Sequence, residues 1–139
     1  MLIKLTESDS QILECFPVLA QLRPDLKQET FLEQVQRQKQ GGYQLSFLER
    51  DGQVLAVAGF CISECLAWGR FLYVYDLVVD EAARSEGYGQ NLFEWLIEFA
   101  KHYDCKQLHL DSGVQRFDAH RFYLRQRMNI ASHHFSLNL

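Results

Sequence analysis

The feature that most constrains the fold lies at residues 71–103, where the spacing of apolar side chains changes from a strand pattern to a helix pattern. Residues 71–79 read FLYVYDLVV and are almost entirely β-branched, aromatic or leucine, which is typical of a strand. Apolar side chains then recur at the spacing of one helix face, at Leu92, Leu96, Phe99 and Tyr103. Two glycines, Gly87 and Gly89, separate the two patterns. A strand, a glycine loop and an amphipathic helix in this order predict helices packed on a sheet.

The rest of the chain supplies further strands and helices. We expect strands at 2–6, 43–48, 54–62, 106–111 and 130–137, and helices between the Ser8–Gln11 capping box and Pro24, at 28–40 and at 117–126. Turn signals at Asp51-Gly52 and Trp68-Gly69 connect three strands into an antiparallel meander, and the helix before 106–111 makes that strand parallel to 71–79. The expected fold class is therefore a single-domain α/β (α+β) fold over residues 1–139. Its sheet is mixed, mostly antiparallel and twisted, with about six to seven strands flanked by about four helices.

Composition argues against several functional classes. The 139 residues match one domain, and a net charge of −4 without a basic stripe argues against nucleic acid as a partner. No apolar run reaches the roughly 18 residues of a membrane span, and the chain turns polar after Leu5, unlike a signal peptide. We therefore expect a cytoplasmic protein with no membrane partner. The cysteines form no CxxC pair and predict reduced thiols without a metal: Cys15, Cys61, Cys65 and Cys105.

Residues 84–90, Arg-Ser-Glu-Gly-Tyr-Gly-Gln, are the segment best suited to binding a ligand. Glycine lets a backbone turn tightly and approach a ligand closely. The helix that follows presents unpaired N–H groups and its positive dipole end, so the segment suits a pyrophosphate, with Arg84 as a charged contact. The alternative is an ordinary connection between a strand and a helix. The segment is neither a P-loop, since no Gly-Lys-Ser/Thr follows, nor a dinucleotide fingerprint, since the first glycine is missing.

The sequence here resembles the GNAT superfamily of N-acetyltransferases, whose motif R/Q-x-x-G-x-G/A follows a strand that often reads D-L-V-V. In this chain Asp76-Leu77-Val78-Val79 precedes Arg84, and residues 119–123 resemble the A-x-x-F-Y helix of the family. The resemblance covers residues 43–137. It implies that an acetyl group moves from acetyl-CoA to a primary amine by direct attack on the thioester, without a metal. The residues that it assigns to acetyl-CoA binding are Leu77, Val78, Val79, Arg84, Ser85, Glu86, Gly87, Tyr88, Gly89, Gln90 and Ala119.

The same resemblance implies two catalytic side chains, Tyr123 and Asp76. An alkyl amine with a pKa of about 10.4 must lose a proton before it attacks, and a general acid helps thiolate release. Tyr123 matches the family's acid and Asp76 a base near the amine; the alternatives are a packed aromatic ring and an aspartate that bonds the backbone. Other candidate bases are His109, Asp111 and His120. A main-chain N–H at a bulge, at Val78 or its neighbours, would stabilise charge on the thioester oxygen.

One position departs from the family pattern. The family usually reads Tyr-x-x-x-Gly-Phe at the end of the Tyr123 helix, and this chain has Arg127-Met128 in place of the last two residues. Glycine at 127 would supply a left-handed helix end, so Arg127 is either mildly strained or ends the helix differently.

The identity of the amine acceptor is the part of the function that the sequence determines least. In this family specificity lies in the helices at 7–40 and the loop at 63–70, and small-molecule and peptide amines are both candidates. Tyr73 and Tyr75 either line the acceptor cleft or pack in the core. An exposed strand at 130–137 would pair in a homodimer. The alternative function is a non-catalytic acetyl-CoA-binding or regulatory interaction module of the same fold, which needs the glycine loop but neither the tyrosine nor a base.

Overall fold

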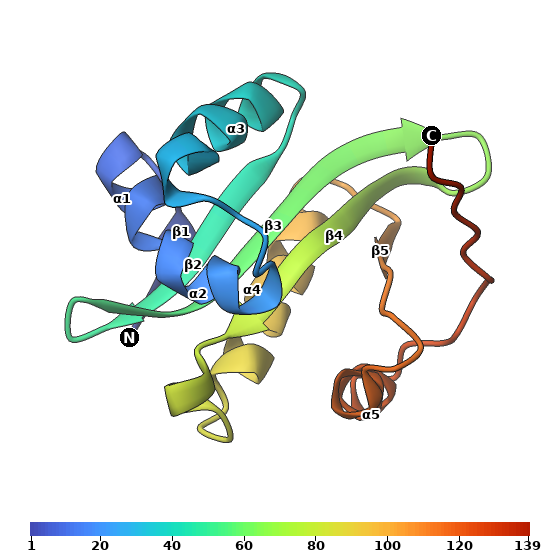
Figure 1. The fold of residues 1–139 in the computed structure, drawn as a ribbon. Coiled ribbons are helices and arrows are strands. Elements are labelled where there is room, and N and C mark those ends of the chain that lie inside the picture. Colours follow the sequence, from blue (N-terminus) through green and yellow to red (C-terminus); the bar gives the residue numbers. More distant parts are fainter. The chain divides into compact units, whose positions relative to one another are not determined.

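The computed structural model describes residues 1–139 (Figure 1). Its five strands form one sheet in the order β1 (Leu2–Leu5), β2 (Gln44–Arg50), β3 (Gln53–Cys65), β4 (Gly69–Val79) and β5 (Gln107–Leu110). The helices are α1 (Asp9–Glu14), α2 (Phe16–Leu22), α3 (Gln28–Gln40), α4 (Tyr88–His102) and α5 (Phe117–Arg125). This is the expected α/β class, with five strands in place of the six or seven expected. The chain divides into two compact units, Met1–His109 and Leu110–Leu139, which we call unit 1 and unit 2.

The antiparallel meander is confirmed. β1 pairs with β2, β2 with β3 and β3 with β4, each pair antiparallel. Asp51 and Gly52 form the turn between β2 and β3, and both have left-handed backbones with φ of 53° and 76°. Two left-handed residues match the twist of a tight hairpin, which explains why an Asp-Gly pair stands there.

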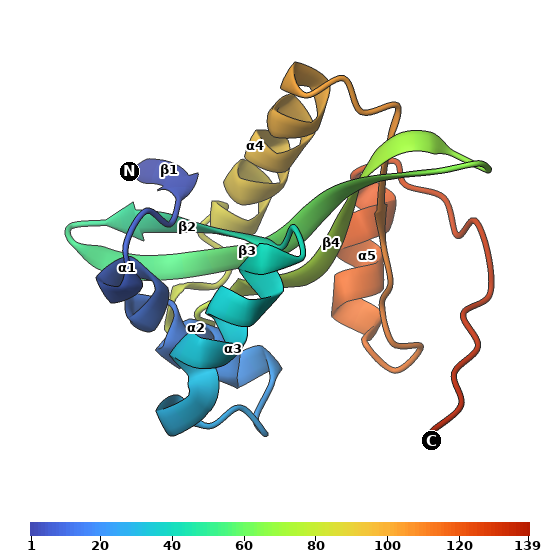
Figure 2. The same cartoon turned by 90° about the horizontal axis from the view of Figure 1, so that it is seen from above.

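Helices cover both faces of the sheet in unit 1 (Figure 2). On the α4 face, the Phe60 ring of β3 contacts the rings of Trp95 and Phe99, with centroids 6.3 and 5.2 Å apart. On the other face, α1, α2 and α3 bury an apolar cluster that includes Ile12, Val18, Leu19, Phe31, Val35, Phe47, Val57 and Val78. Because Val78 belongs to this cluster, the helices reach the end of the strand that leads into the glycine segment.

The single helix expected before Pro24 is two helices. Ser8 caps α1 as expected, since its Oγ accepts a hydrogen bond from the Gln11 N–H at 3.2 Å. However, α1 ends at Glu14 and α2 begins at Phe16. Pro17 accounts for the break, because proline lacks the N–H that a continuous helix would use and its ring clashes with the preceding turn.

The strand β4 contains a bulge. Across β3, Gly59 pairs with Asp76 and the next residue pairs with Val74, so Tyr75 has no partner residue. A bulge leaves one residue outside the regular ladder and turns the strand. The bulge expected at Val78 or its neighbours therefore lies nearer the middle of β4, at Tyr75.

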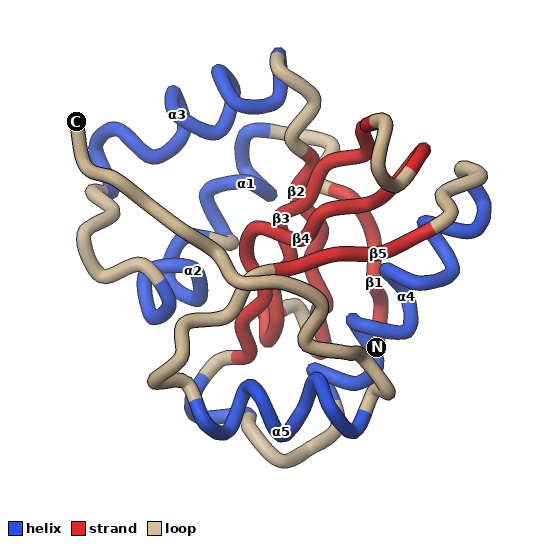
Figure 3. Tube along the Cα trace, turned by 90° about the vertical axis from the view of Figure 1, so that its right-hand side faces the viewer, coloured by secondary structure: helices blue, strands red, loops and turns tan.

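Unit 2 consists of α5 and segments without regular structure, apart from Leu110 at the end of β5 (Figure 3). The prediction of a strand at 130–137 is wrong, because the chain after α5 forms neither helix nor strand. A strand needs a neighbour that pairs with its backbone groups, and the rest of unit 2 offers no strand beside it. Its apolar side chains are accordingly exposed at Ile130, Phe135 and Leu137. Pairing of this segment in a homodimer stays a prediction.

Candidate functional site

The segment 84–90 follows the short 3-10 helix η1 (Glu81–Ala83): residues 84–87 lead into α4, and residues 88–90 are its first turn. Ser85 and Gly87 both have left-handed backbones, with φ of 68° and 85°. Gly87 is the N-cap residue of α4, and no side chain caps the helix, so its first N–H groups are available to a ligand. Residues 84–87 are exposed. A helix that begins in this way is chemically suited to bind an anion such as a pyrophosphate.

Tyr88 connects this segment to the sheet. The Tyr88 side chain is buried, and its hydroxyl accepts a hydrogen bond from Arg50 Nη1 at 3.0 Å. Arg50 is the last residue of β2. No sequence motif marks Arg50 as part of the site, because the contact joins residues far apart in the chain.

The end of α2 makes a second connection to the same region. Gln21 Nε2 donates to Asp80 Oδ1 at 3.3 Å, and Gln21 Oε1 accepts from the Glu81 N–H at 2.9 Å. Asp80 also caps η1, since its Oδ1 accepts from the Ala82 N–H at 3.0 Å. These contacts hold the chain where it leaves β4 and turns toward the glycine segment.

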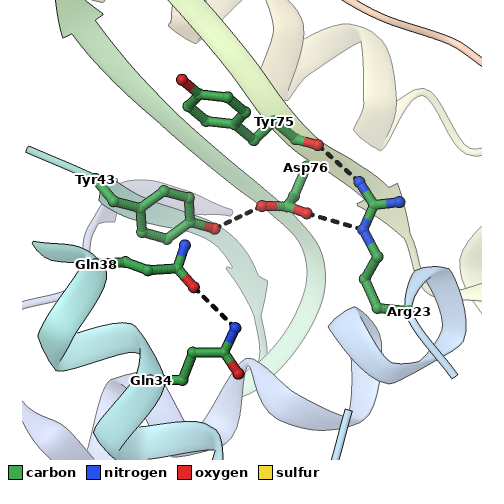
Figure 4. A network of polar contacts seen from close by, with 6 residues as sticks. All are labelled: Arg23, Gln34, Gln38, Tyr43, Tyr75 and Asp76. Atoms are coloured by element: carbon green, nitrogen blue, oxygen red, sulfur yellow. Dashed lines mark hydrogen bonds and ion pairs between the residues drawn. The ribbon is translucent and has the colours of Figure 1, made fainter. Parts of the chain in front are cut away.

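Asp76 lies at the centre of a polar network (Figure 4). The Tyr43 hydroxyl donates to Asp76 Oδ2 at 2.7 Å, and Arg23 Nε forms an ion pair with Asp76 Oδ1 at 3.1 Å. Arg23 Nη2 also donates to the Tyr75 carbonyl oxygen at 2.8 Å. Burial and the adjacent Asp76 carboxylate raise the pKa of Tyr43, so its hydroxyl stays protonated and remains a donor. Both oxygens of the predicted base are therefore engaged within the protein.

Gly59 leaves the space that this network occupies. A Cβ atom at Gly59 would overlap the Tyr43 hydroxyl and lie 2.8 Å from Asp76 Oδ2. The sequence carried a signal for this contact, because a lone glycine inside an apolar strand often marks a bulge or a close approach. Tyr43 and Arg23 carried no such signal.

Tyr73 and Tyr75 belong to a row of rings on one side of β4. Their centroids are 5.2 Å apart, and the Tyr73 ring lies parallel to the His109 ring at 6.3 Å. His109 in turn stacks on Trp68 at 3.6 Å. Tyr75 is 52% exposed and Tyr73 is half-buried, so these side chains are not a closed core. The rings provide a partly exposed aromatic surface beside Asp76.

Unit 2 carries the remaining predicted site residues, Ala119 and Tyr123, on α5. Tyr123 is in the last turn, and its carbonyl oxygen accepts from the Met128 N–H at 3.2 Å. Burial raises the pKa of the Tyr123 hydroxyl above its usual range, and the guanidinium of Arg116 partly opposes this effect. Ala119 lies at the start of α5, beside a shallow hollow of about 350 Å³ that is lined by Gln115, Arg116, Phe117, Asp118 and Arg121.

Each of the other candidate bases has a partner. His109 stacks on Trp68, as described above, and its Nε2 lies 2.6 Å from a glutamine oxygen. In unit 2, His120 Nε2 lies 2.7 Å from a backbone carbonyl oxygen, and Asp111 lies 3.4 Å from His134 Nδ1. On their contacts alone, none of these three side chains is a better candidate for the general base than Asp76.

Two further observations concern metals and membranes. No group of three or more histidine, cysteine, aspartate or glutamate side chains is arranged to hold a metal ion. No helix is long and apolar enough to cross a lipid bilayer.

Comparison with known proteins decides the family. The family model described as the acetyltransferase (GNAT) family matches residues 9–128. The chain belongs to the GNAT family. Acetyltransferases of this family use acetyl-CoA, whose pyrophosphate is an anion of the kind that the segment 84–90 suits.

Individual relatives agree with this assignment. YhdJ, an uncharacterized N-acetyltransferase of Bacillus subtilis, is 32% identical over 123 residues, which cover 87% of this chain and 86% of YhdJ. A ribosomal-protein-alanine N-acetyltransferase from Brucella melitensis has a TM-score of 0.86 at 16% identity, and a putative acetyltransferase from Agrobacterium tumefaciens has 0.85 at 20%. Both structures match over 100% of either chain, and at these identities they support the GNAT fold alone.

Proposed function

We propose that this GNAT protein transfers the acetyl group of acetyl-CoA to a primary amine by direct attack on the thioester. The observation that carries the proposal is the start of α4, where Gly87 and Ser85 turn the chain through left-handed conformations in front of uncapped N–H groups. This arrangement suits a pyrophosphate. Acetyl-CoA supplies the activated thioester, and the chain supplies binding, orientation and proton transfer.

The backbone of Leu77–Val79 supports a second contact with acetyl-CoA. The Lys106 N–H donates to the Arg70 carbonyl oxygen at 2.7 Å, which sets the start of β5 beside the start of β4. A strand–helix–strand connection makes the two strands parallel, and β5 has 4 residues against 11 in β4. The edge of β4 at Leu77–Val79 therefore extends beyond β5. We assign to it the pairing with the pantetheine amide groups, as an added strand would pair.

Tyr123 is the proposed general acid. A tyrosine hydroxyl whose pKa lies above its usual value holds its proton at neutral pH and can give it to the departing thiolate. Its neighbour Phe122 contacts the Tyr123 ring edge to face, with centroids 5.6 Å apart. Because neighbouring residues of a helix point about 100° apart, one of the two rings can pack while the other faces a ligand.

The proton of the attacking amine is proposed to leave to a base or through water. Asp76 is the residue predicted as the base, and Tyr43 and Arg23 each donate a hydrogen bond to one of its two oxygens. Whether Asp76 takes the proton from the amine is therefore a question for mutagenesis of Asp76. A water relay gives the same product without a free carboxylate.

The acceptor is proposed to be a small-molecule or peptide amine that binds beside the aromatic surface of Tyr73 and Tyr75. The test is a panel of amino acids, polyamines, aminosugars and peptide N-termini incubated with acetyl-CoA. Products are identified by mass spectrometry, and thiol release is measured in parallel. We expect a mass gain of one acetyl group on at least one class of amine. Tight binding of acetyl-CoA in a calorimeter without acetylation of any amine would favour the non-catalytic module instead.

A further inference from the structure

We propose that Asp76 is a positioning residue, which acts with Arg23 and Tyr43 to hold the bulge of β4, and that the amine proton is taken up elsewhere. The proposal rests on the proposed function, because it concerns the strand assigned to bind acetyl-CoA. It replaces the role of base predicted for Asp76. It also gives a role to Arg23, which no sequence motif marked.

The bulge of β4 leaves backbone groups that need a partner outside the sheet. Tyr75 has no partner residue in β3, so its backbone groups are outside the regular ladder. Backbone groups without a ladder partner need another partner. Arg23 Nη2 fills this need for the Tyr75 carbonyl oxygen at 2.8 Å. Because a trans peptide is planar, fixing the Tyr75 oxygen also fixes the direction of the Asp76 N–H in the same peptide.

The Asp76 carboxylate is held from two sides. Arg23 bonds Asp76 Oδ1 through Nε, so one guanidinium contacts the side chain of Asp76 and the carbonyl oxygen just before it. Two contacts from one planar group set an orientation as well as a distance. Tyr43 contacts the other oxygen, Oδ2, at 2.7 Å. Gly59, opposite Asp76 in β3, leaves the room that Tyr43 needs.

The surroundings of Asp76 weigh against its acting as the base. A general base needs a lone pair directed at the proton that it removes. The Asp76 side chain is only 16% exposed, and each of its oxygens already accepts one hydrogen bond, from Tyr43 or from Arg23, which leaves at most one lone-pair site on each oxygen. Contacts on both oxygens fit a group whose task is to hold the backbone better than a group that exchanges protons with a substrate.

The network is continuous with the proposed acetyl-CoA site. The end of α2 contacts both ends of the segment 75–81. Arg23 binds its start at Tyr75 and Asp76, and Gln21 binds its end at Asp80 and Glu81. Residues 77–79 lie between these contacts, and they are the residues assigned to the pantetheine arm. The contacts of α2 therefore fix the strand on which the thioester is placed.

The experiment compares Asp76→Asn, Arg23→Gln, the double variant and Tyr43→Phe across pH 6–9. We expect each single variant to lose about 10- to 100-fold in kcat/KM, because small misplacements of reacting groups cost this much. The double variant should lose little more than one single variant, since both changes break one network. The pH dependence should keep its wild-type shape in Asp76→Asn. Arg37→Gln, an exposed arginine of α3, is the matched control and should retain activity.

The outcome that overturns the proposal is equally specific. If Asp76 is the base, Asp76→Asn loses more than about 10²-fold in kcat/KM, while Arg23→Gln and Tyr43→Phe keep most of the activity. Tyr43→Phe retains the buried ring, so it tests the network even if Asp76→Asn folds poorly.

A second measurement separates this proposal from the proposed function. Amide hydrogen exchange of residues 75–79 should become faster in Arg23→Gln than in Arg37→Gln, with no amine or acetyl-CoA present. Unchanged exchange there would overturn the positioning role. Failure of the wild-type protein to acetylate any amine, together with faster exchange in Arg23→Gln, would overturn only the proposed function.

Discussion

The hydroxyl of Tyr88 accepts a hydrogen bond from Arg50 at 3.0 Å, and this contact joins the end of β2 to the first residue of α4. Tyr88 stands between Gly87 and Gly89, and glycine has the least restricted backbone of all residues. A buried ring held at its hydroxyl restricts the conformations of the glycines on either side. The contact thus ties the segment to the sheet, which would lower the entropic cost of the proposed acetyl-CoA binding.

Tyr88→Phe tests this role of the hydroxyl. The ring stays buried and only the contact with Arg50 is lost, so we expect the fold to persist. Binding of acetyl-CoA should weaken by about three- to tenfold in a calorimeter, because the loop loses one hydrogen bond that orders it. Tyr103→Phe removes a hydroxyl from a partly exposed tyrosine just after α4 and should leave the affinity unchanged. Equal affinity in both variants would show that the Arg50 contact does not order the loop for the ligand.

Gly87→Ala tests the conformation of the loop. The φ of 85° costs an alanine about 1–2 kcal/mol, and a shifted backbone would redirect the N–H groups at the start of α4. We expect acetyl-CoA binding to be lost or reduced by more than about tenfold, since the proposed N–H contacts with the pyrophosphate depend on this turn.

The matched control is Gly69→Ala at the start of β4. Gly69 has a similar φ of 71°, and an added Cβ there would lie 4.0 Å from Lys106 Cγ, an ordinary contact. Both variants should lose similar thermal stability, while only Gly87→Ala should lose affinity. Retained affinity in Gly87→Ala would remove the assignment of the pyrophosphate to this segment.

The parts of the fold that the sequence predicted are those with a local cause. The turn at Asp51-Gly52 depends on two adjacent residues that adopt left-handed backbones at low cost. The start of α4 depends on a change of apolar spacing across Gly87. The capping by Ser8 depends on a contact three residues away. Each of these signals is contained in a few neighbouring residues, and each is confirmed in the structure.

The parts that the sequence did not predict depend on distant contacts. The ion pair between Arg23 and Asp76 joins residues 53 positions apart, and Tyr43 lies 33 positions from Asp76. Nothing near any of the three residues indicates that they meet. For the segment 130–137 the sequence predicted a strand that is absent. Its residues suit a strand, but a strand forms only beside a partner strand. Local propensity therefore located the loop but not the network around Asp76.

Tyr123→Phe tests the general acid. The hydroxyl must carry its proton to act, and its raised pKa means that the wild-type rate should fall only at pH values above about 10, the ordinary pKa of tyrosine. Removing the hydroxyl should lower kcat by about 10²-fold at pH 7 and remove this alkaline decline. The affinity for acetyl-CoA should change little. A variant with an unchanged kcat and pH–rate profile would assign Tyr123 to packing beside Phe122.

Arg127 stands where the family usually has glycine, and its backbone is strained. Its φ is 65°, so it holds the left-handed conformation that the family usually gives to glycine. The Arg127 N–H bonds the Leu124 carbonyl oxygen at 3.0 Å and the Met128 N–H bonds that of Tyr123 at 3.2 Å. These two bonds form a Schellman motif that closes α5. The helix therefore ends as in the family, with an arginine in a conformation that costs about 1–2 kcal/mol.

Arg127→Gly should consequently stabilise the protein. Glycine removes the strain but adds roughly 0.5–1 kcal/mol of chain entropy to the unfolded state, so the net gain is about 0.5–1 kcal/mol. This corresponds to a rise in Tm of about 1–4 °C, measured by thermal unfolding. Arg125→Gly makes the same exchange at the last residue of α5, where the backbone is helical, and should lower the Tm instead. If both substitutions lower the Tm, Arg127 has side-chain contacts in solution that outweigh its backbone strain.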